Sequence, residues 1–288
     1  IVCGNDPKND VEVIVSKWIH KIPVSLIITP NKSSASINLN RGLEKASGKI
    51  FCRVDSHCIL DKDYLRQGMT QFKKKYPKYS AIGPSVNIIG RSEGLISQLI
   101  AKLYMSPFLL GPSKFKRSFF YKNYSGPTDS IFLGFYLTDD LLGLQGFNEK
   151  ISKKQDIELL TRLKNKKGQG FYNSNLIKVD YILKHDSLIL LSKRCFNQGS
   201  ILFESLASSR SIHFIPISSL IIFLIILAIW FPIGLILLFS YLSLCIFFGL
   251  IEKTSAFSFF LAPIIFPTLH ISYVLGNLIG LSKKMLKK

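Results

Sequence analysis

The pattern of hydrophobic and polar positions divides the 288-residue chain near residue 212. Before that point, short apolar runs alternate with polar segments, as in a soluble α/β domain. After it, apolar residues dominate almost without interruption. We therefore predict two domains, one at 1–211 and one at 212–288.

The first part alternates expected strands and helices. Apolar runs at 1–4, 24–29 and 48–54 predict strands, and the segments 11–20 and 35–46 between them predict helices. This alternation is typical of a Rossmann-like, mostly parallel sheet with flanking helices, which binds ligands beyond the carboxyl ends of its strands. The later elements expected from the same pattern are helices at 63–76, 95–104 and 155–167, a strand at 79–89, a long loop at 105–125 and a strand with a turn at 126–137.

The second part has the composition of membrane helices. Two apolar segments, 213–231 and 233–251, are each long enough to cross a bilayer, which takes about 20 residues. A third, 257–281, contains Pro263 and Pro267 and leads into a lysine-rich tail. Because basic segments stay in the cytoplasm, three crossings cannot satisfy both the basic first domain and the tail. We expect the third segment to be re-entrant or interfacial, in a multi-pass protein of the cell membrane with its first domain in the cytoplasm.

The net charge of +19 favours anionic lipid headgroups and phosphorylated substrates as partners. Nucleic acid is disfavoured, because the basic residues are scattered rather than gathered in a recognisable motif. The five cysteines have no paired spacing, which fits a reducing cytoplasm. The chain opens at 1–4 as if inside a strand and without methionine, so we interpret it as a piece that lacks a first strand and helix.

Candidate chemistry begins at the end of the third expected strand, where Asp55 and His57 stand two residues apart. In a strand, residues at this spacing share a face. Three interpretations compete: a site for a divalent metal, a zinc site that also uses Cys52 and Cys58, and a strand end with solvated polar residues. Zinc is disfavoured, because the two cysteines would lie on the opposite face from Asp55 and His57.

A set of motifs, weak singly but ordered and spaced together, resembles a family 2 glycosyltransferase of the GT-A fold, and more closely the membrane-anchored succinoglycan-biosynthesis type of glucosyltransferase. The resemblance covers nearly the whole chain and rests on Asn38-Leu39-Asn40-Arg41-Gly42, Arg53-Val54-Asp55-Ser56-His57, Ser106-Pro107-Phe108 with Gly111 and Ser113-Lys114-Phe115, Asp129-Ser130-Ile131-Phe132-Leu133-Gly134, Gly146-Phe147-Asn148-Glu149, and Gln155-Asp156-Ile157-Glu158-Leu159 through Arg162-Leu163.

The resemblance implies a nucleotide-sugar donor, a divalent cation and inversion at the anomeric carbon. Asp55 matches the first acid of the family's Asp-x-Asp motif, which holds Mn²⁺ or Mg²⁺ against the donor diphosphate, and His57 stands in place of the second acid. Such a cation stabilises the charge on the departing diphosphate. Asp156 matches the family's catalytic base. Its alternative role is to favour a helix N-terminus, worth roughly 0.3–1 kcal/mol.

Further donor-site residues are expected from the same motifs: Asn38, Arg53 and Asp129. Gly4 stands where the family usually has an aspartate that holds the nucleotide, with Asp6 as the nearest substitute. His185 is a weaker candidate near the diphosphate. Glu158 and Arg162, four residues apart on a helix, are expected to form an ion pair.

The resulting hypothesis is transfer of a hexose from a nucleotide sugar to a lipid-linked saccharide acceptor, in exopolysaccharide or cell-surface glycan synthesis. One alternative is a catalytically inactive membrane-anchored binding or scaffold protein. Another is a processive polysaccharide synthase, which is disfavoured because the Gln-x-x-Arg-Trp motif of such enzymes is absent and residues 193–199 stand in the corresponding region.

Overall fold

A computed structural model describes residues 1–4, 10–30, 33–110, 124–151, 155–183, 187–200, 215–251 and 257–286. The chain packs into two compact units. The first comprises residues 1–86 and 117–179, and the second comprises residues 87–116 and 180–288. The predicted functional boundary at residue 211 is a different division and stays a prediction.

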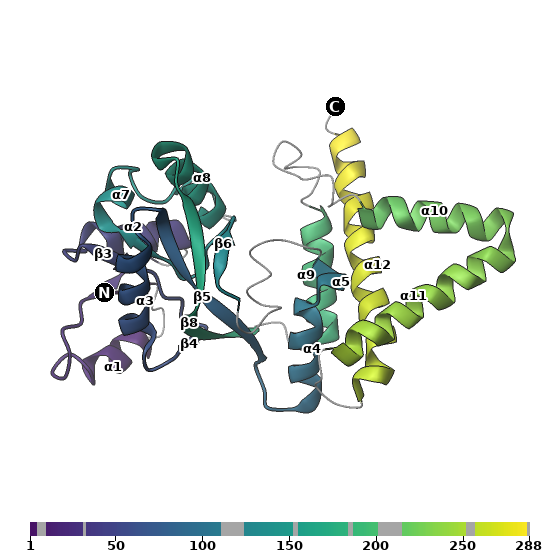
Figure 1. Cartoon of the computed structure of the whole chain (residues 1–288), viewed down its shortest axis with the longest axis horizontal. Coiled ribbons are helices and arrows are strands. Elements are labelled where there is room, and N and C mark those ends of the chain that lie inside the picture. Colours follow the sequence, from purple (N-terminus) through teal and green to yellow (C-terminus); the bar gives the residue numbers. More distant parts are fainter. Residues whose placement is uncertain are drawn as a thin grey trace. The chain divides into compact units, whose positions relative to one another are not determined.

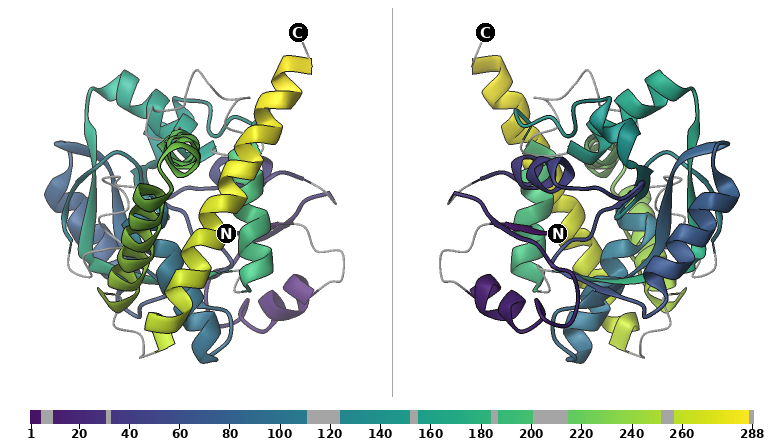
Figure 2. Two further views of the ribbon diagram at one scale, coloured as in Figure 1. Left: turned by 90° about the vertical axis from the view of Figure 1, so that its right-hand side faces the viewer. Right: turned by 90° about the vertical axis from the view of Figure 1, so that its left-hand side faces the viewer.

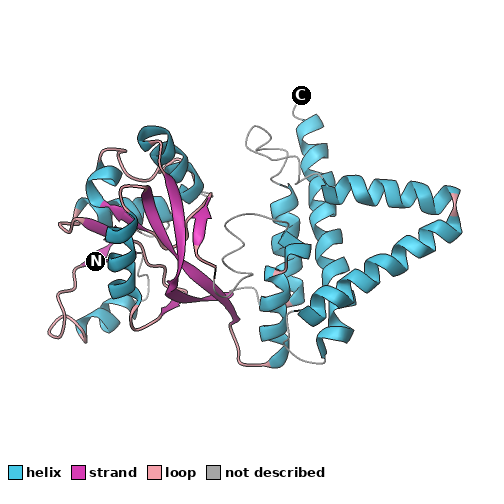
Figure 3. Ribbon diagram, viewed as in Figure 1, coloured by secondary structure: helices cyan, strands magenta, loops and turns pink. Residues whose placement is uncertain are grey.

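The first unit is built on β-strands flanked by helices (Figures 1 and 3). Two short strands, β1 (Val2–Gly4) and β2 (Leu26–Ile28), pair in parallel. A six-stranded sheet has the order β3-β7-β5-β8-β4, with β6 paired to β8. Its strands are β3 (Ile50–Cys52), β4 (Cys58–Leu60), β5 (Tyr79–Gly90), β6 (Gly126–Thr128), β7 (Phe135–Leu137) and β8 (Gly170–Leu183).

Four helices of this unit overlap expected segments, and a fifth, the short α7, was not expected. They are α1 (Asp10–Ser16), α2 (Ala35–Glu44), α3 (Tyr64–Lys75), α7 (Thr138–Leu142) and α8 (Gln155–Lys167). The Ser34 side chain caps α2 by accepting from the backbone N–H of Ile37. Gly168 follows α8 with φ of +68°, the left-handed conformation that glycine adopts without strain, so the predicted end of this helix is confirmed.

The expected sheet composition needs one correction. The parallel βαβ pattern holds for β1 and β2, but β7 runs antiparallel to both β3 and β5, and β6 runs antiparallel to β8. These pairs of the six-stranded sheet are therefore antiparallel rather than parallel, and the parallel pair of β1 and β2 forms a separate two-stranded sheet. The physical reason is that β7 lies between β3 and β5 and runs opposite to both, a pairing between segments that are distant in sequence.

The core of the first unit lies between the sheet and its helices. It contains ten buried apolar residues: Leu43, Ala81, Ile131, Tyr136, Leu141, Phe147, Leu159, Leu160, Leu163 and Phe171. Three of them form the buried face of α8: Leu159, Leu160 and Leu163. That face fixes the helix whose first turn carries Asp156, so apolar packing positions a candidate catalytic carboxylate.

The second unit is mainly helical. It contains α4 (Leu95–Met105), α5 (Pro107–Leu110), α9 (Leu188–Ser200), α10 (Ile215–Ile229), α11 (Phe231–Ile251) and α12 (Phe257–Leu286). Buried side chains from α4, α9, α11 and α12 share one core. The α9 and α12 helices lie side by side, as both views in Figure 2 show.

Two of these helices are long and apolar enough to cross a membrane: α11, with 21 residues, and residues 257–283 of α12, with 27. Only 17% and 33% of their most apolar windows are buried within the protein. The described part of α10 has 15 residues and spans about 23 Å, and the residues just before it lie outside the described ones. The third apolar segment is one helix that continues through Pro263 and Pro267, and its expected re-entrant or interfacial placement stays a prediction.

The contact between α9 and α12 depends on glycines that let the two backbones approach. A Cβ added at Gly276 would lie 2.0 Å from the Phe196 carbonyl oxygen, and one at Gly280 would lie 2.3 Å from that of Ser200. Small residues at such positions are typical of helix pairs in membranes.

Replacing Gly276 with leucine should therefore separate α9 from α12 and lower the melting temperature of the purified protein in detergent. The expected cost is about 1–3 kcal/mol or more, because the obstacle is backbone rather than a mobile side chain. Ser282→Leu, on the exposed part of the same helix, adds a similar side chain and should change the melting temperature little. Equal effects of the two changes would contradict the close packing.

Candidate active site

The candidate site is assembled where β3 ends against β7. Their pairing stops at Cys52 and Phe135, and the backbone N–H of Arg53 then donates to the Gly134 carbonyl oxygen at 3.1 Å. Leu133, the residue before Gly134, has φ of +52° and is almost fully buried. Its carbonyl oxygen accepts from the buried Tyr64 hydroxyl at 2.8 Å, which holds this unusual turn in place.

Arg53 joins two carboxylates that stand far apart in the sequence. Its Nε donates to Asp55 Oδ1 at 2.9 Å and its Nη2 donates to Asp55 Oδ2 at 3.2 Å, while its Nη1 donates to Asp156 Oδ1. The exposed fractions of the three side chains are 10%, 15% and 29%. The two carboxylates with the strongest predicted roles therefore share one guanidinium group.

The electrostatics of this group distinguish its members. Burial raises the pKa of the Asp156 carboxyl above its usual range, and the charge of Arg53 only partly opposes that effect. Tyr136, on β7, was not expected from the sequence. Burial and then the charge of Asp156 raise the pKa of its phenol well above the usual range, so it stays protonated. Of Asp156 and Tyr136, Asp156 is consequently the better proton acceptor.

The local conformation at Asp55 and His57 differs from the expected strand face. β3 ends at Cys52, and the Cys58 N–H donates to the Asp55 carbonyl oxygen at 3.1 Å, so the two residues lie in a turn between β3 and β4. The expectation that they share a strand face was wrong, because strand pairing with β7 does not extend that far. His57 is half-buried in that turn.

The zinc interpretation finds little support in this geometry. Burial raises the pKa of the Cys52 thiol to about 12, and burial with the Asp55 charge raises that of Cys58 to about 12 as well. Both thiols are therefore protonated in the metal-free protein. Among the described residues, no group of three or more His, Cys, Asp or Glu side chains is placed to hold a metal.

The donor set nevertheless fits a divalent cation that is shared with a substrate. Such a cation often takes only one or two protein carboxylates together with substrate phosphates. The Asp55 carboxylate is nearly buried and already holds a positively charged group, the Arg53 guanidinium, on both of its oxygens. Asp55 is the described residue best placed as a ligand.

The other predicted site residues lie elsewhere or outside the described residues. Asn38, on α2, accepts at Oδ1 from Thr29 at 2.7 Å and from Ser33 at 2.9 Å. Asp129 is exposed on the bend that follows β6. Asp6 and His185 fall outside the described residues. The roles of these four residues stay predictions.

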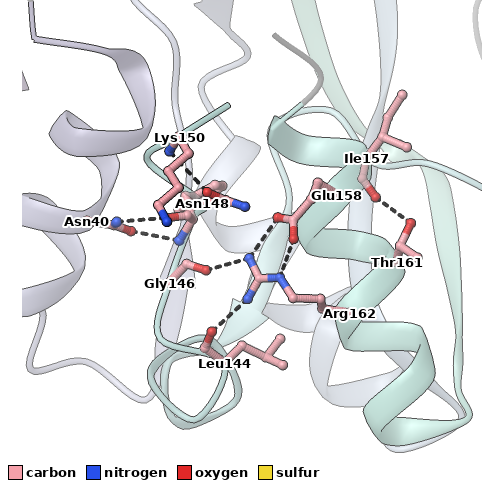
Figure 4. A network of polar contacts seen from close by, with 10 residues as sticks. Asn40, Leu144, Gly146, Asn148, Lys150, Ile157, Glu158, Thr161 and Arg162 are labelled. Carbon is pink, nitrogen blue, oxygen red and sulfur yellow. Dashed lines mark hydrogen bonds and ion pairs between the residues drawn. The ribbon is translucent and has the colours of Figure 1, made fainter. Parts of the chain in front are cut away.

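A second polar network positions the turn that precedes α8 (Figure 4). The predicted pair of Glu158 and Arg162 is confirmed, with Nε and Oε1 separated by 2.6 Å. The Arg162 guanidinium also donates to the carbonyl oxygens of Leu144 at 2.6 Å and Gly146 at 2.8 Å. The turn at residues 143–149 is thereby attached to the helix that carries Asp156.

Asn40 holds the other side of this turn. From α2, its Nδ2 donates to the Phe147 carbonyl oxygen at 2.9 Å, and its Oδ1 accepts from the Phe147 N–H at 2.7 Å. Gly146 has φ of +68°, and a Cβ there would lie 2.3 Å from Asn40 Oδ1. The turn therefore requires both a glycine and the asparagine.

Asn40→Ala should lower the free energy of unfolding by about 1–3 kcal/mol, because it leaves the backbone groups of Phe147 without their partner. We also expect slower turnover, since the turn leads towards Asp156. Chemical denaturation and a transfer assay would measure the two effects. Asn148→Ala removes only the contact from the Lys150 N–H within the turn and should change both quantities less. Wild-type stability in Asn40→Ala would contradict this role.

Comparison with known proteins supports the expected family. Residues 1–134 match the family model described as "Glycosyl transferase family 2". No curated protein sequence matches the chain. The match covers the segment from β1 to the turn at Gly134, and so includes Arg53 and Asp55 but not Asp156.

Solved structures show the fold. The mannosyltransferase PcManGT from Pyrobaculum calidifontis, in complex with GDP-Man and Mn²⁺, has 14% identity and a TM-score of 0.52, and the likeness covers 98% of this chain and 77% of that one. Residues 1–349 of S. aureus TarS have 13% identity and a TM-score of 0.46, over 99% and 81%. GalNAc-T7 with UDP, GalNAc and Mn²⁺ has 12% identity and a TM-score of 0.43, over 62% of this chain and 35% of that one. The likeness to PcManGT confirms the expected GT-A class.

Proposed function

We propose, on the premise that residues 1–134 match glycosyltransferase family 2, that the protein transfers a sugar from a nucleotide-sugar donor with inversion at the anomeric carbon. The observation that carries this proposal is the convergence of Asp55 and Asp156 on Arg53, across 103 residues of sequence from Arg53 to Asp156. Inverting transfer needs both a group that stabilises the departing diphosphate and a base for the incoming alcohol.

In this mechanism different residues hold the cation, accept the proton and contact the donor. Asp55, with His57 as a second ligand, holds a divalent cation, Mn²⁺ or Mg²⁺, which when bound offsets negative charge on the diphosphate. Asp156 accepts the proton of the acceptor hydroxyl while the oxygen of that hydroxyl forms a bond to the anomeric carbon. The bond from that carbon to the diphosphate oxygen breaks at the same time, and the nucleoside diphosphate leaves with its electron pair. Asn38, Arg53, Asp129 and Asp6 are the proposed donor contacts.

The substrates proposed are a hexose nucleotide and a lipid-linked saccharide. The acceptor follows from the helical unit, whose apolar helices α11 and α12 expose most of their surface. A saccharide attached to a lipid would present its sugar to a domain held at the membrane. The finer likeness to the succinoglycan type of glucosyltransferase belongs to this proposal as well.

The membrane arrangement proposed is two crossings, by α11 and α12, with α10 on the cytoplasmic side. This arrangement places the basic first unit and the lysine-rich tail on the same, cytoplasmic, side and so satisfies the positive-inside rule. A C-terminal tag should therefore be digested by protease in inside-out vesicles and protected in right-side-out vesicles. A tag protected in inside-out vesicles would contradict two crossings.

A transfer assay tests the proposed function. Membranes that contain the full-length protein would be incubated with Mn²⁺ and, in turn, with radiolabelled UDP-, GDP- and dTDP-hexoses, and then extracted with organic solvent. Label should enter the lipid extract with one of these donors and should be lost with EDTA. Absence of transfer from every donor would favour the inactive scaffold, and transfer that persists in Asp156→Asn would refute the assignment of the base.

A further inference from the structure

The Arg53 guanidinium contacts the same carboxylate oxygens that a cation would use. Its Nε and Nη2 take the two oxygens of Asp55, and its Nη1 takes Oδ1 of Asp156. A bidentate contact of this kind is the strongest form that an arginine makes with a carboxylate. With an exposed fraction of 10%, the arginine side chain is also shielded from solvent. Both Asp55 oxygens are thus already engaged by one positive charge.

From this geometry, and resting on the proposed function, we infer that Arg53 and a divalent cation bind Asp55 in turn, so that arrival of the cation displaces the guanidinium. Two arguments lead to this exchange. Each Asp55 oxygen accepts one hydrogen bond from Arg53, so an ion could use only the remaining lone pairs and would have to lie beside the guanidinium. A dication bound beside the guanidinium would also repel it, because the two positive charges would lie within a few ångströms of each other.

The exchange has a consequence for the second carboxylate. While Arg53 holds Asp156, the guanidinium stabilises the carboxylate as an anion and restrains its position, which makes it a weaker base. Displacement of Arg53 from Asp55 removes two of the three contacts that fix the guanidinium, and the charge of the bound cation repels it from the third, at Asp156. Asp156 is then freed only when the cation is in place. Arg53 is in this view a positioning residue that couples the cation site to the base.

Binding of Mn²⁺ to the purified full-length protein in detergent, without donor, provides the test. Electron paramagnetic resonance of free Mn²⁺ would give the dissociation constant. Arg53→Gln removes the competing charge and should tighten Mn²⁺ binding by about tenfold. Arg66→Gln removes an equal charge from an exposed pair with Asp63 and should leave the constant within about twofold of wild type, since surface pairs matter little.

A measurement on the unaltered protein covers the case in which Arg53→Gln fails to fold. Phenylglyoxal modifies accessible arginines, and mass spectrometry of the peptides locates the modified residue. Arg53 should react faster at saturating Mn²⁺ than without it, while Arg66 reacts at the same rate in both. Slower or unchanged modification of Arg53 with Mn²⁺ would overturn the exchange.

The outcomes separate this inference from the proposed function. Mn²⁺ binding that Asp55→Asn abolishes, but that Arg53→Gln leaves unchanged or weakens, overturns the exchange and keeps Asp55 as the ligand. Mn²⁺ binding that survives Asp55→Asn overturns both. Tighter binding in Arg53→Gln, together with faster labelling of Arg53 in wild type, supports the exchange even if no donor sugar is found.

Discussion

Asparagine in place of Asp156 should lower kcat by about 10²–10⁴-fold, which is the usual contribution of a general base. The amide cannot accept the proton of the acceptor hydroxyl, yet it keeps the size of the side chain. Its carbonyl oxygen can still accept from Arg53 Nη1, so the group around Asp55 should survive. Initial rates of transfer at saturating donor, with melting temperature as a check on folding, would measure the loss.

A matched variant separates catalysis from an effect on the helix. Asp156 stands in the first turn of α8, where any carboxylate favours the helix by about 0.3–1 kcal/mol. Asp139 stands exposed in the first turn of α7. Asp139→Asn should therefore change stability by about as much as a helix effect of Asp156→Asn would, and it should leave kcat unchanged. Similar losses of kcat in the two variants would reduce Asp156 to a structural residue.

The pH dependence of kcat offers an independent view of the same carboxylate. Burial raises the pKa of Asp156, and a base must be ionised to act. Activity should therefore fall as the pH falls through this raised pKa, at a pH above the value of about 4 that is usual for aspartate. In Asp156→Asn this acidic limb should disappear from the residual rate, since the group that titrates is gone.

Elements with strong local signals were predictable from the sequence. The helix expected at 155–167 is α8 (Gln155–Lys167), and its end at Gly168 and its ion pair between Glu158 and Arg162 were both anticipated. These features depend on residues within one or two turns of each other. Caps, glycine stops and pairs four residues apart are decided locally, so one sequence is enough to identify them.

The sheet was less predictable because its pairing is decided over long distances. The chain gives no local sign that β7 enters between β3 and β5, and this insertion introduces the antiparallel pairs that were not expected. The strand β8 was not anticipated, since the buried Asn173 and Ser174 interrupt its apolar pattern. Burial of polar side chains inside a strand follows from neighbours that are distant in sequence.

The candidate site shows the same division. Motifs identified Asp55 and Asp156 as carboxylates of interest, and a turn was expected within 126–137. Their meeting through Arg53 depends on the contact of that turn with the end of β3, which no pattern revealed. Arg53 was expected to contact the donor. Its observed partners are carboxylates 2 and 103 residues away, a pairing that only the folded chain defines.

Asparagine in place of Asp55 should lower kcat/KM for the donor by about 10²–10³-fold, because the stabilisation of a leaving group by a bound ion is worth several kcal/mol. The remaining rate should no longer depend on the concentration of Mn²⁺. Asp63→Asn, at an exposed aspartate that pairs with Arg66, removes the same charge and should retain the normal dependence. A wild-type response to Mn²⁺ in Asp55→Asn would show that another group holds the ion.

The double variant of Asp55 and Asp156 tests whether the two carboxylates act as a unit. Without Asp55 no cation is bound to repel the guanidinium, which keeps Asp156 as its anionic partner among the contacts described here. The single change at Asp55 should therefore also weaken the base. The losses should then not add: the double variant should be far more active than the product of the two single effects predicts. Strict additivity would instead mean that Arg53 does not couple the ion to the base, and that each carboxylate acts alone.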